Sequence, residues 1–321
     1  MNSVTVVGSF NVDHVWRCEA LPAPGATIAG SYSTGPGGKG FNQAVAAARA
    51  GAATRLVCAL GADAGGALAR ELAQADGIEL LAADSTEPTG TAGIYVEGRG
   101  RNTILVGPGA NATLDTAFVD AHRSALARAS VVLVQLESPL ETIVHALQIA
   151  REAGVTTVLN PAPANAPSSM ALRGLADILT PNETEFSALL LRYVGERLPA
   201  EDVASLDGAR LHALCRQLLP EGTVVVTLGA VGAFVSHPDT GLRGDATPYY
   251  RVAADVAQAI DTTGAGDAFN GALAASLARA RDAPFQSHMR FANRYAARST
   301  ERAGAAASMP RKEELEPLPP A

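Results

Sequence analysis

Cysteine and basic charge are scarce in this chain of 321 residues, and each scarcity excludes a class of protein. The three cysteines, Cys18, Cys58 and Cys215, are odd in number and have no CxxC spacing, so neither a disulfide framework nor a zinc site is indicated. Lys and Arg total 25 against 32 Asp and Glu, and the net charge of -7 provides no basic field that could collect a polyanion. We therefore expect no nucleic-acid partner, although a small anion held by local amides is compatible with this balance.

Long apolar runs are also missing. No stretch of 18 consecutive apolar residues occurs, and the amino-terminal MNSVTVVGSF has neither a basic nor an apolar leader region, so we expect no membrane partner and a cytoplasmic location. Apolar residues still make up 47% of the chain and charged residues 18%. This composition is typical of a globular protein with enough apolar material for a core.

Short apolar runs alternate with helical segments along most of the chain. An Ala-rich helix is predicted over about residues 40–50, and further helical segments separate the later apolar runs. Continuous apolar strands between helices predict an α/β fold, with a large parallel sheet covered on both faces. The predicted strands are residues 4–8, 54–59, 131–135, 155–159, 177–179 and 224–227.

Two stretches interrupt this alternation, at about residues 12–36 and 91–106. In the second, TAGIYV and NTILV flank the turn-like EGRGR and predict a hairpin. We expect both stretches to form a small discontinuous β-sheet lid on a single catalytic domain of residues 1–310. Lids of this kind usually exclude water from the reaction. The Pro-rich residues 311–321 are predicted to be a tail, and residues 192–205 a surface excursion; neither is assigned a function.

The motif DTTGAGDAFNG contains a glycine turn that opens a helix over about residues 264–280. The unpaired N–H groups of Gly264, Ala265 and Gly266 can converge at the helix N-terminus, where the helix dipole also favours an anion such as a transferring phosphoryl group. Asp267 in the first turn is then placed to act as a base for the attacking hydroxyl. The competing interpretation is that an acidic residue in a first turn only complements the dipole.

A second glycine turn, GPGGKGFNQA, also leads into a helix. No Ser or Thr follows Lys39 and the four-residue spacer is absent, so the turn is not a P-loop. Gly38 can make room for a small polar ligand, and the Asn42 amide can both donate to and accept from hydroxyls, although a plain turn with a helix cap fits as well. Asn11 and Asp13 share one face of an extended segment and suit a vicinal diol, or else form a solvated edge.

The segment TPNETE places Asn182 and Glu185 on one face of a helical first turn. An amide and a carboxylate there can orient waters around a Mg²⁺ ion that bridges phosphates. A capping box explains the same spacing. Further along, Thr227, Gly229 and Gly232 end a strand with a glycine turn, which suits a nucleotide at the carboxyl end of the strand.

Over residues 4–310 the chain resembles the PfkB or ribokinase family of carbohydrate kinases, through GGKGFNQAVAAARAGA and DTTGAGDAFNGAL. The segments GSFNVDH, LESPLET, NPAPA, TPNETE and TLGAVGA are most similar to members that act on D-ribose. The resemblance implies a ribokinase-like fold and ATP-dependent phosphorylation of the primary (5-) hydroxyl of D-ribose, with Asp267 as base and an anion hole at residues 264–267, giving ribose 5-phosphate and ADP. Two alternatives remain open: a family kinase for deoxyribose, another pentose or hexose, or a nucleoside, and a non-catalytic sugar-binding regulator.

The same resemblance implies the site residues on the sugar side and at the nucleotide. Asn293 stands where a His is familiar in the family, near the adenine. The implied sugar pocket contains Asn11, Asp13, Gly38, Lys39, Asn42, Glu137 and Asp267, with no separate role for Lys39. The implied ATP site contains Asn182, Thr227, Gly229, Gly232, the 264–267 turn and Asn293, with Glu185 acting through hydrated Mg²⁺.

Family members are also activated by a monovalent cation, normally K⁺, held mainly by backbone carbonyls, and they often pair through their lids. We therefore expect K⁺ as an activator and a homodimer through the lid. The implied cation loop involves Asp261, Thr263, Ser299, Arg302, Gly304 and Ser308.

Overall fold

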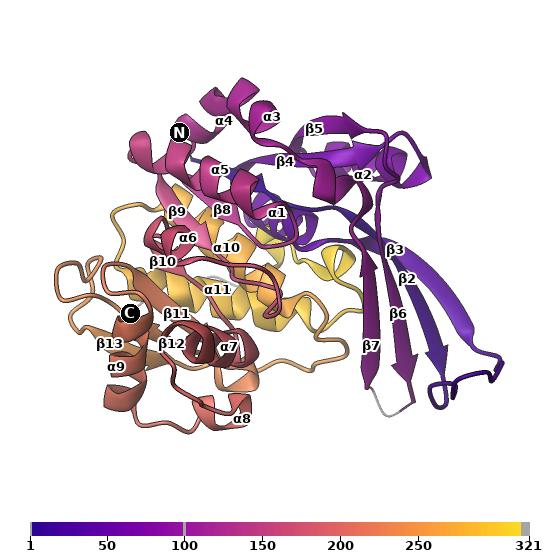
Figure 1. The fold of residues 1–321 in the computed structure, drawn as a ribbon. Coiled ribbons are helices and arrows are strands. Elements are labelled where there is room, and N and C mark those ends of the chain that lie inside the picture. The colour runs from indigo at the N-terminus through magenta and orange to yellow at the C-terminus, as the bar shows by residue number, and fades with distance from the viewer. Residues whose placement is uncertain (1, 99–100, 316–321) are drawn as a thin grey trace.

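A nine-stranded sheet with helices on both faces forms the body of the protein (Figure 1). The computed structural model describes residues 2–98 and 101–315. The strand order is β13-β12-β11-β10-β9-β8-β1-β4-β5, and all neighbours from β11 to β5 are parallel. The strands are β1 (Ser3–Val7), β4 (Ala53–Gly61), β5 (Glu79–Ser85), β8 (Val131–Val134), β9 (Thr156–Leu159), β10 (Ile178–Leu179), β11 (Thr223–Thr227), β12 (Ala233–Ser236) and β13 (Tyr249–Val252).

Successive side chains of these strands enter two separate cores, one on each face of the sheet. In β1, for example, Val4 and Val6 belong to one core and Val7 to the other, and all three are fully buried. The first core packs against α1 (Lys39–Arg49), α2 (Ala64–Ala75), α10 (Ala265–Arg279) and α11 (Phe285–Ser299). The second packs against α3 (Thr116–Ala121), α4 (Arg123–Ala127), α5 (Leu140–Glu152), α6 (Met170–Gly174), α7 (Glu183–Tyr193), α8 (Ala200–Val203) and α9 (Gly208–Leu218). Four 3-10 helices complete the described part of the chain: η1 (Gly109–Thr113), η2 (Gly229–Val231), η3 (Ala306–Ser308) and η4 (Lys312–Glu314).

Close packing of α1 against α10 brings the two glycine motifs together. A Cβ atom at Gly271 of α10 would lie 2.4 Å from the backbone oxygen of Gln43 and 2.5 Å from Cβ of Ala46 in α1. Only glycine permits this approach. The first turns of both helices therefore lie next to each other, although they come from opposite ends of the sequence.

Four further strands form a small sheet that projects from one side of the body (Figure 1). They are β2 (Asn11–Cys18), β3 (Ser31–Gly37), β6 (Gly90–Glu97) and β7 (Asn102–Gly107), in the order β3-β2-β6-β7. The pair β2 and β6 is parallel, and the two outer pairs are antiparallel. The predicted fold class, a large α/β sheet with a small discontinuous sheet, is confirmed. Residues 99 and 100 of the predicted EGRGR turn lie outside the described residues.

The large sheet differs from the expected parallel arrangement at one edge. Strands β12 and β13, which the sequence analysis did not identify, pair antiparallel. Only residues 228–232 connect β11 to β12, and a parallel crossover needs a dozen residues or more. Of the predicted tail, Leu315 packs against the core and Arg311 lies 3.2 Å from the carboxylate of Asp76, while residues 316–321 lie outside the described residues.

Candidate functional site

The glycine turn before Asp267 has the backbone that an anion site requires. Gly264 is the N-cap of α10 with φ 77 and ψ 3, a left-handed conformation, and a Cβ atom there would lie 2.9 Å from Cβ of Ala305. Within residues 2–98 and 101–315, the N–H groups of Gly264 and Gly266 have no hydrogen-bond partner. The expectation of three unpaired amides is wrong for Ala265, whose N–H donates to the Thr262 carbonyl at 3.2 Å to close the turn.

Asp267 is 7% exposed, and both of its carboxylate oxygens accept hydrogen bonds from α1. Asn42 donates from Nδ2 to Oδ2 at 2.9 Å, and Gln43 donates from Nε2 to Oδ1 at 2.9 Å. Burial raises the pKa of Asp267, and this effect outweighs the Lys39 charge and the two amide donors, which lower it. The sequence analysis did not select Gln43, although its place beside Asn42 in the second motif is a signal that could have identified it.

Three further charged groups surround this carboxylate. Glu137 Oε2 accepts hydrogen bonds from Ser9 Oγ at 2.6 Å and from the Lys39 backbone N–H at 2.9 Å. Burial, Glu137 and Asp267 together raise the pKa of Asp13 to about 6. Burial lowers the pKa of the Lys39 ammonium, but the surrounding carboxylates outweigh it and the pKa lies above its ordinary value. An ammonium among carboxylates on a partly buried surface suits a ligand rich in hydroxyl groups.

The remaining sugar-side residues lie at the same place. Gly38 has φ 88, and a Cβ atom there would lie 2.8 Å from the backbone nitrogen of Asn11, so the glycine turn presses directly on the start of β2. Asn11 is buried, and its Oδ1 accepts from Asn111 Nδ2 at 2.8 Å. Asn42 Oδ1 is buried and has no hydrogen-bond partner among the residues that the structure describes. An orphaned acceptor beside Asp267 fits a hydroxyl donor.

A cavity of about 580 Å³ adjoins the first turn of α10. Asn293 lines it and donates from Nδ2 to the carbonyls of Val252 and Ala253, both at 3.1 Å, which fixes the start of residues 254–259 along the wall. Sequence reasoning missed this wall, because an irregular segment has no periodic pattern. Besides Asn293, the cavity is lined by the predicted residues Asn182, Thr227, Gly229, Gly232, Ala265 and Gly266.

Asn182 and Glu185 form the capping box of α7. Glu185 N–H donates to Asn182 Oδ1 at 2.8 Å, and Asn182 N–H donates to Glu185 Oε2 at 2.9 Å. Asn182 also forms a β-bridge with Thr227, and both residues line the cavity. Glu185 is 5% exposed, and burial raises its pKa. The capping role is therefore observed. In the described part of the chain no three His, Cys, Asp or Glu side chains form a group that could hold a metal ion by themselves.

The residues of the implied cation loop tie two segments of backbone together. Asp261 accepts from the Thr263 N–H through Oδ1 and from the Gly304 N–H through Oδ2, both at 2.9 Å. Three of the other side chains have partners close in sequence: Ser299 Oγ donates to the Ala296 carbonyl, Ser308 Oγ donates to the Ala305 carbonyl, and Arg302 pairs with Glu314. The side chains of Asp261, Ser299, Arg302 and Ser308 are thus engaged within the protein, and a cation here would depend mainly on backbone carbonyl oxygens.

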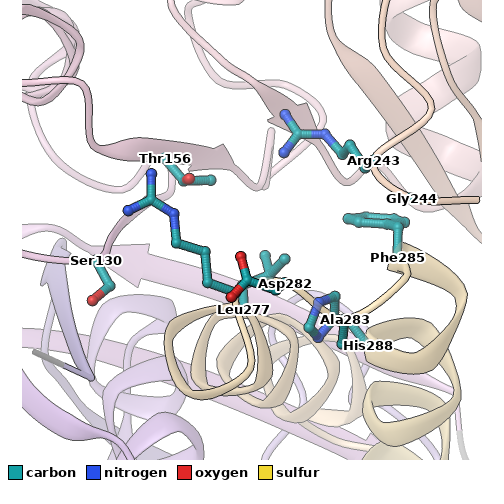
Figure 2. Close-up of a pocket in the computed structure, with 10 residues that line it drawn as sticks. Ser130, Thr156, Arg243, Gly244, Leu277, Asp282, Ala283, Phe285 and His288 are labelled. Carbon is teal, nitrogen blue, oxygen red and sulfur yellow. The ribbon is translucent and has the colours of Figure 1, made fainter.

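A second cavity, of about 380 Å³, lies at the edge of the sheet where β8 and β9 begin, whereas the first cavity lies where the parallel strands end (Figure 2). Its lining includes Ser130, Thr156 and Arg243. The Arg243 guanidinium donates to Thr223 Oγ1 at 3.0 Å and to the Asp177 carbonyl at 3.2 Å, so it fastens its loop to the sheet. None of the predicted site residues lines this cavity.

Comparison with known proteins identifies the family. The model of the pfkB family of carbohydrate kinases matches residues 1–312. The chain belongs to this family. This pfkB-family kinase is 38% identical over 317 residues to ribokinase from Haemophilus influenzae, with 97% of this chain and 96% of the relative covered. It is 32% identical over 317 residues to deoxyribokinase from Salmonella typhi, with 97% of each covered.

Solved structures agree with this assignment. The pfkB-family kinase matches ribokinase from Giardia lamblia with a TM-score of 0.85 and 28% identity, covering 97% of this chain and 96% of that one. It matches Arabidopsis thaliana ribokinase, solved in complex with ribose and ATP, with a TM-score of 0.81 and 30% identity, covering 97% and 96%. The predicted enzyme class, a sugar kinase, is confirmed. Within residues 2–98 and 101–315 no helix is both long and apolar enough to cross a membrane.

Proposed function

We propose that the protein transfers the γ-phosphoryl group of ATP to the primary (5-) hydroxyl of D-ribose, giving ribose 5-phosphate and ADP. The observation that carries the proposal is the position of Asp267. It is buried near the acidic residues Asp13 and Glu137 and belongs to the first turn of α10, which the cavity adjoins. It also directly follows Gly266, whose N–H group is unpaired. Ribokinases from Haemophilus influenzae and Arabidopsis thaliana support ribose as the acceptor.

The sugar side has groups that recognise hydroxyls. Asp13 and Glu137 are carboxylates that accept hydrogen bonds, and Asn42 presents the unsatisfied acceptor Oδ1. We place Asn11 and Gly38 at the wall of the proposed sugar site, where the two residues lie in contact with each other. A missing hydroxyl would leave one of these acceptors without a partner, and such a loss discriminates strongly between sugars.

In the proposed reaction, the Asp267 carboxylate accepts the proton of the primary hydroxyl as the hydroxyl oxygen attacks the γ-phosphorus. The bond from that phosphorus to the bridging oxygen breaks, and its electron pair leaves with ADP. The N–H groups of Gly264 and Gly266 donate to the phosphoryl oxygens as negative charge develops there, and the Lys39 ammonium adds a positive charge nearby. Asp267 then releases the proton to solvent.

The cavity beside α10 suits ATP. Val256 and Ala296 give it apolar wall for an adenine, and Asn182 and Thr227 give it polar groups at the carboxyl edge of the sheet. A bound Mg²⁺ ion would neutralise phosphate charge, and the described residues fit one held mainly by phosphates and water, with Glu185 in its outer shell. We also propose that K⁺ binds at backbone carbonyls of the two segments that Asp261 joins to Gly304. A cation there would fix the turn that begins α10.

The small sheet is proposed to act as a lid and to pair with a second copy. The exposed rings of Trp16, Tyr32 and Tyr95 pack together on its face opposite Asp13. The Trp16 ring centroid lies 5.2 Å from that of Tyr95, which is stacked on it, and 5.2 Å from that of Tyr32, which is tilted. Light scattering should give the mass of a homodimer for the wild type and of a monomer for Trp16→Glu; a wild-type monomer would contradict pairing.

We place the protein in the cytoplasm, because its free cysteines suit a reducing compartment.

ATP turnover with D-ribose, 2-deoxyribose, fructose and a nucleoside, each with and without K⁺, tests the proposal. We expect the highest kcat/KM with D-ribose and a loss of rate without K⁺. A preference for 2-deoxyribose, the alternative that the Salmonella typhi relative favours, would keep the chemistry and change the substrate. A lack of ATP turnover with all four acceptors would contradict the proposed function.

A further inference from the structure

We infer that Gln43 is a positioning residue that holds Asp267 in the ionised, aligned form a base requires. The inference rests on the proposed function, because it assigns Gln43 a task only if Asp267 removes a proton. Gln43 is the fifth residue of α1 and is fully buried. Burying a primary amide is costly unless each of its polar atoms is hydrogen-bonded, and here all of them are.

The contacts of Gln43 fix the orientation of its amide. Nε2 donates one hydrogen to Asp267 Oδ1 at 2.9 Å and the other to Asn160 Oδ1 at 3.0 Å, while Oε1 accepts from Gln135 Nε2. A carboxylate can only accept, and the Gln135 donor occupies the oxygen of Gln43. The NH₂ group is therefore held toward Asp267, and the amide cannot reverse without breaking three hydrogen bonds.

The network returns to the same turn of α10 by a second route. Asn160 donates from Nδ2 to the Thr180 carbonyl at 3.0 Å, Thr180 donates from Oγ1 to Asn270 Oδ1 at 2.6 Å, and Asn270 donates from Nδ2 to the Gly266 carbonyl at 2.8 Å. Asn160 and Thr180 directly follow β9 and β10. One buried network thus connects the carboxylate of the base with the glycine turn that holds the phosphate-binding amides.

The amide donors matter because the surroundings of Asp267 disfavour its charge. Burial and Glu137 raise the pKa of Asp267, and Asp13 and Glu185 also place negative charge toward it, whereas Lys39 is the one nearby cation in the described part of the chain. An amide N–H that donates to a carboxyl oxygen stabilises the ionised form more than the protonated form. Removal of the Gln43 donor should favour the protonated form of Asp267 and leave its Oδ1 atom without a hydrogen bond from α1.

The Gln43→Met variant removes the donor while keeping the volume of the side chain. We expect kcat to fall about 10- to 100-fold, from the loss of one hydrogen bond to a charged group. KM for the sugar should change less than about threefold, because Gln43 is fully buried and its amide atoms are all bonded within the protein. The acid limb of the pH profile of kcat should move up by roughly one unit. Gln43→Glu should donate to Asp267 only while its own carboxyl is protonated, so its activity relative to wild type should fall as pH rises.

Thr5→Val provides a matched control for a general loss of packing. Thr5 is fully buried, donates from Oγ1 to the Ala125 carbonyl at 2.8 Å, and lies outside the network. Its melting temperature should fall while its kcat and acid limb stay at wild-type values. The inference is overturned if Gln43→Met keeps the wild-type acid limb, or if its loss of kcat is matched by Thr5→Val at an equal loss of stability.

A measurement without turnover separates this inference from the proposed function. Carboxyl-¹³C NMR of the full chain, with the Asp267 signal assigned by its absence in Asp267→Asn, should report a higher Asp267 pKa in Gln43→Met than in wild type. An unchanged pKa overturns the role of Gln43 even if the enzyme is an active kinase. A raised pKa in a chain that phosphorylates none of the tested sugars supports the network and contradicts the proposed function.

Discussion

Asn42 donates a side-chain N–H to Oδ2 of Asp267 at 2.9 Å, although 225 positions separate the two residues in the sequence. The bond joins the first turns of α1 and α10, which pack closely because Gly271 has no side chain. The two glycine motifs are therefore halves of a single site. In the proposed function, one half contributes groups for the sugar and the other contributes the base and the phosphate-binding amides.

The Asp13→Asn variant should be more stable than wild type near neutral pH. Burial, with Glu137 and Asp267 nearby, raises the pKa of Asp13 from 3.8 to about 6. Between these values the folded state binds the proton more tightly than the unfolded state, so stability falls as pH rises through this window and stays lower above it. Urea unfolding should show a gain on the order of 1 kcal/mol at about pH 7.5 that disappears near pH 4. An equal gain at both pH values would contradict the assigned pKa.

Alanine should be tolerated at Gly266 and not at Gly264. Gly264 adopts a left-handed conformation against Ala305, so Gly264→Ala should lower the free energy of unfolding by about 1–3 kcal/mol. A Cβ atom at Gly266, in the helical first turn, would meet no atom of the described part of the chain within 4 Å, which makes Gly266→Ala the matched control. Thermal unfolding of both variants checks the prediction, and equal melting temperatures would show that the turn is not constrained.

Asn293→Ala should weaken ATP binding without affecting the sugar. The Asn293 amide holds the carbonyls of Val252 and Ala253, and with them the start of residues 254–259 along the cavity. Its loss should raise KM for ATP about tenfold and change KM for the sugar less than about twofold. Steady-state kinetics with each substrate varied in turn measures both constants. A change confined to KM for the sugar would contradict the placement of ATP in this cavity.

The sequence predicts much of the fold because its signals are local. Buried parallel strands such as β8 are continuous apolar runs, and a glycine turn marks the start of α10 directly. The antiparallel edge escaped prediction because β12 gives an equally apolar run and only the short connection from β11 reveals its direction.

The site was predictable only as far as its motifs extend. Gln43 was missed because its task depends on Asp267, Asn160 and Gln135, which are distant in sequence and meet it only in the folded protein. The spacing of Asn182 and Glu185 is the same for a capping box and for a metal-side pair, and coordinates were needed to show the cap. The bond from the Ala265 N–H to the Thr262 carbonyl likewise depends on the exact turn.

The most direct test of the proposed chemistry is the turnover of Asp267→Asn with D-ribose and MgATP, measured beside wild type. An Asn keeps the size of the side chain but cannot accept the proton, so kcat should fall at least about a thousandfold while KM for ribose changes little. A variant that retains more than about a tenth of wild-type kcat would contradict the assignment of Asp267 as the base.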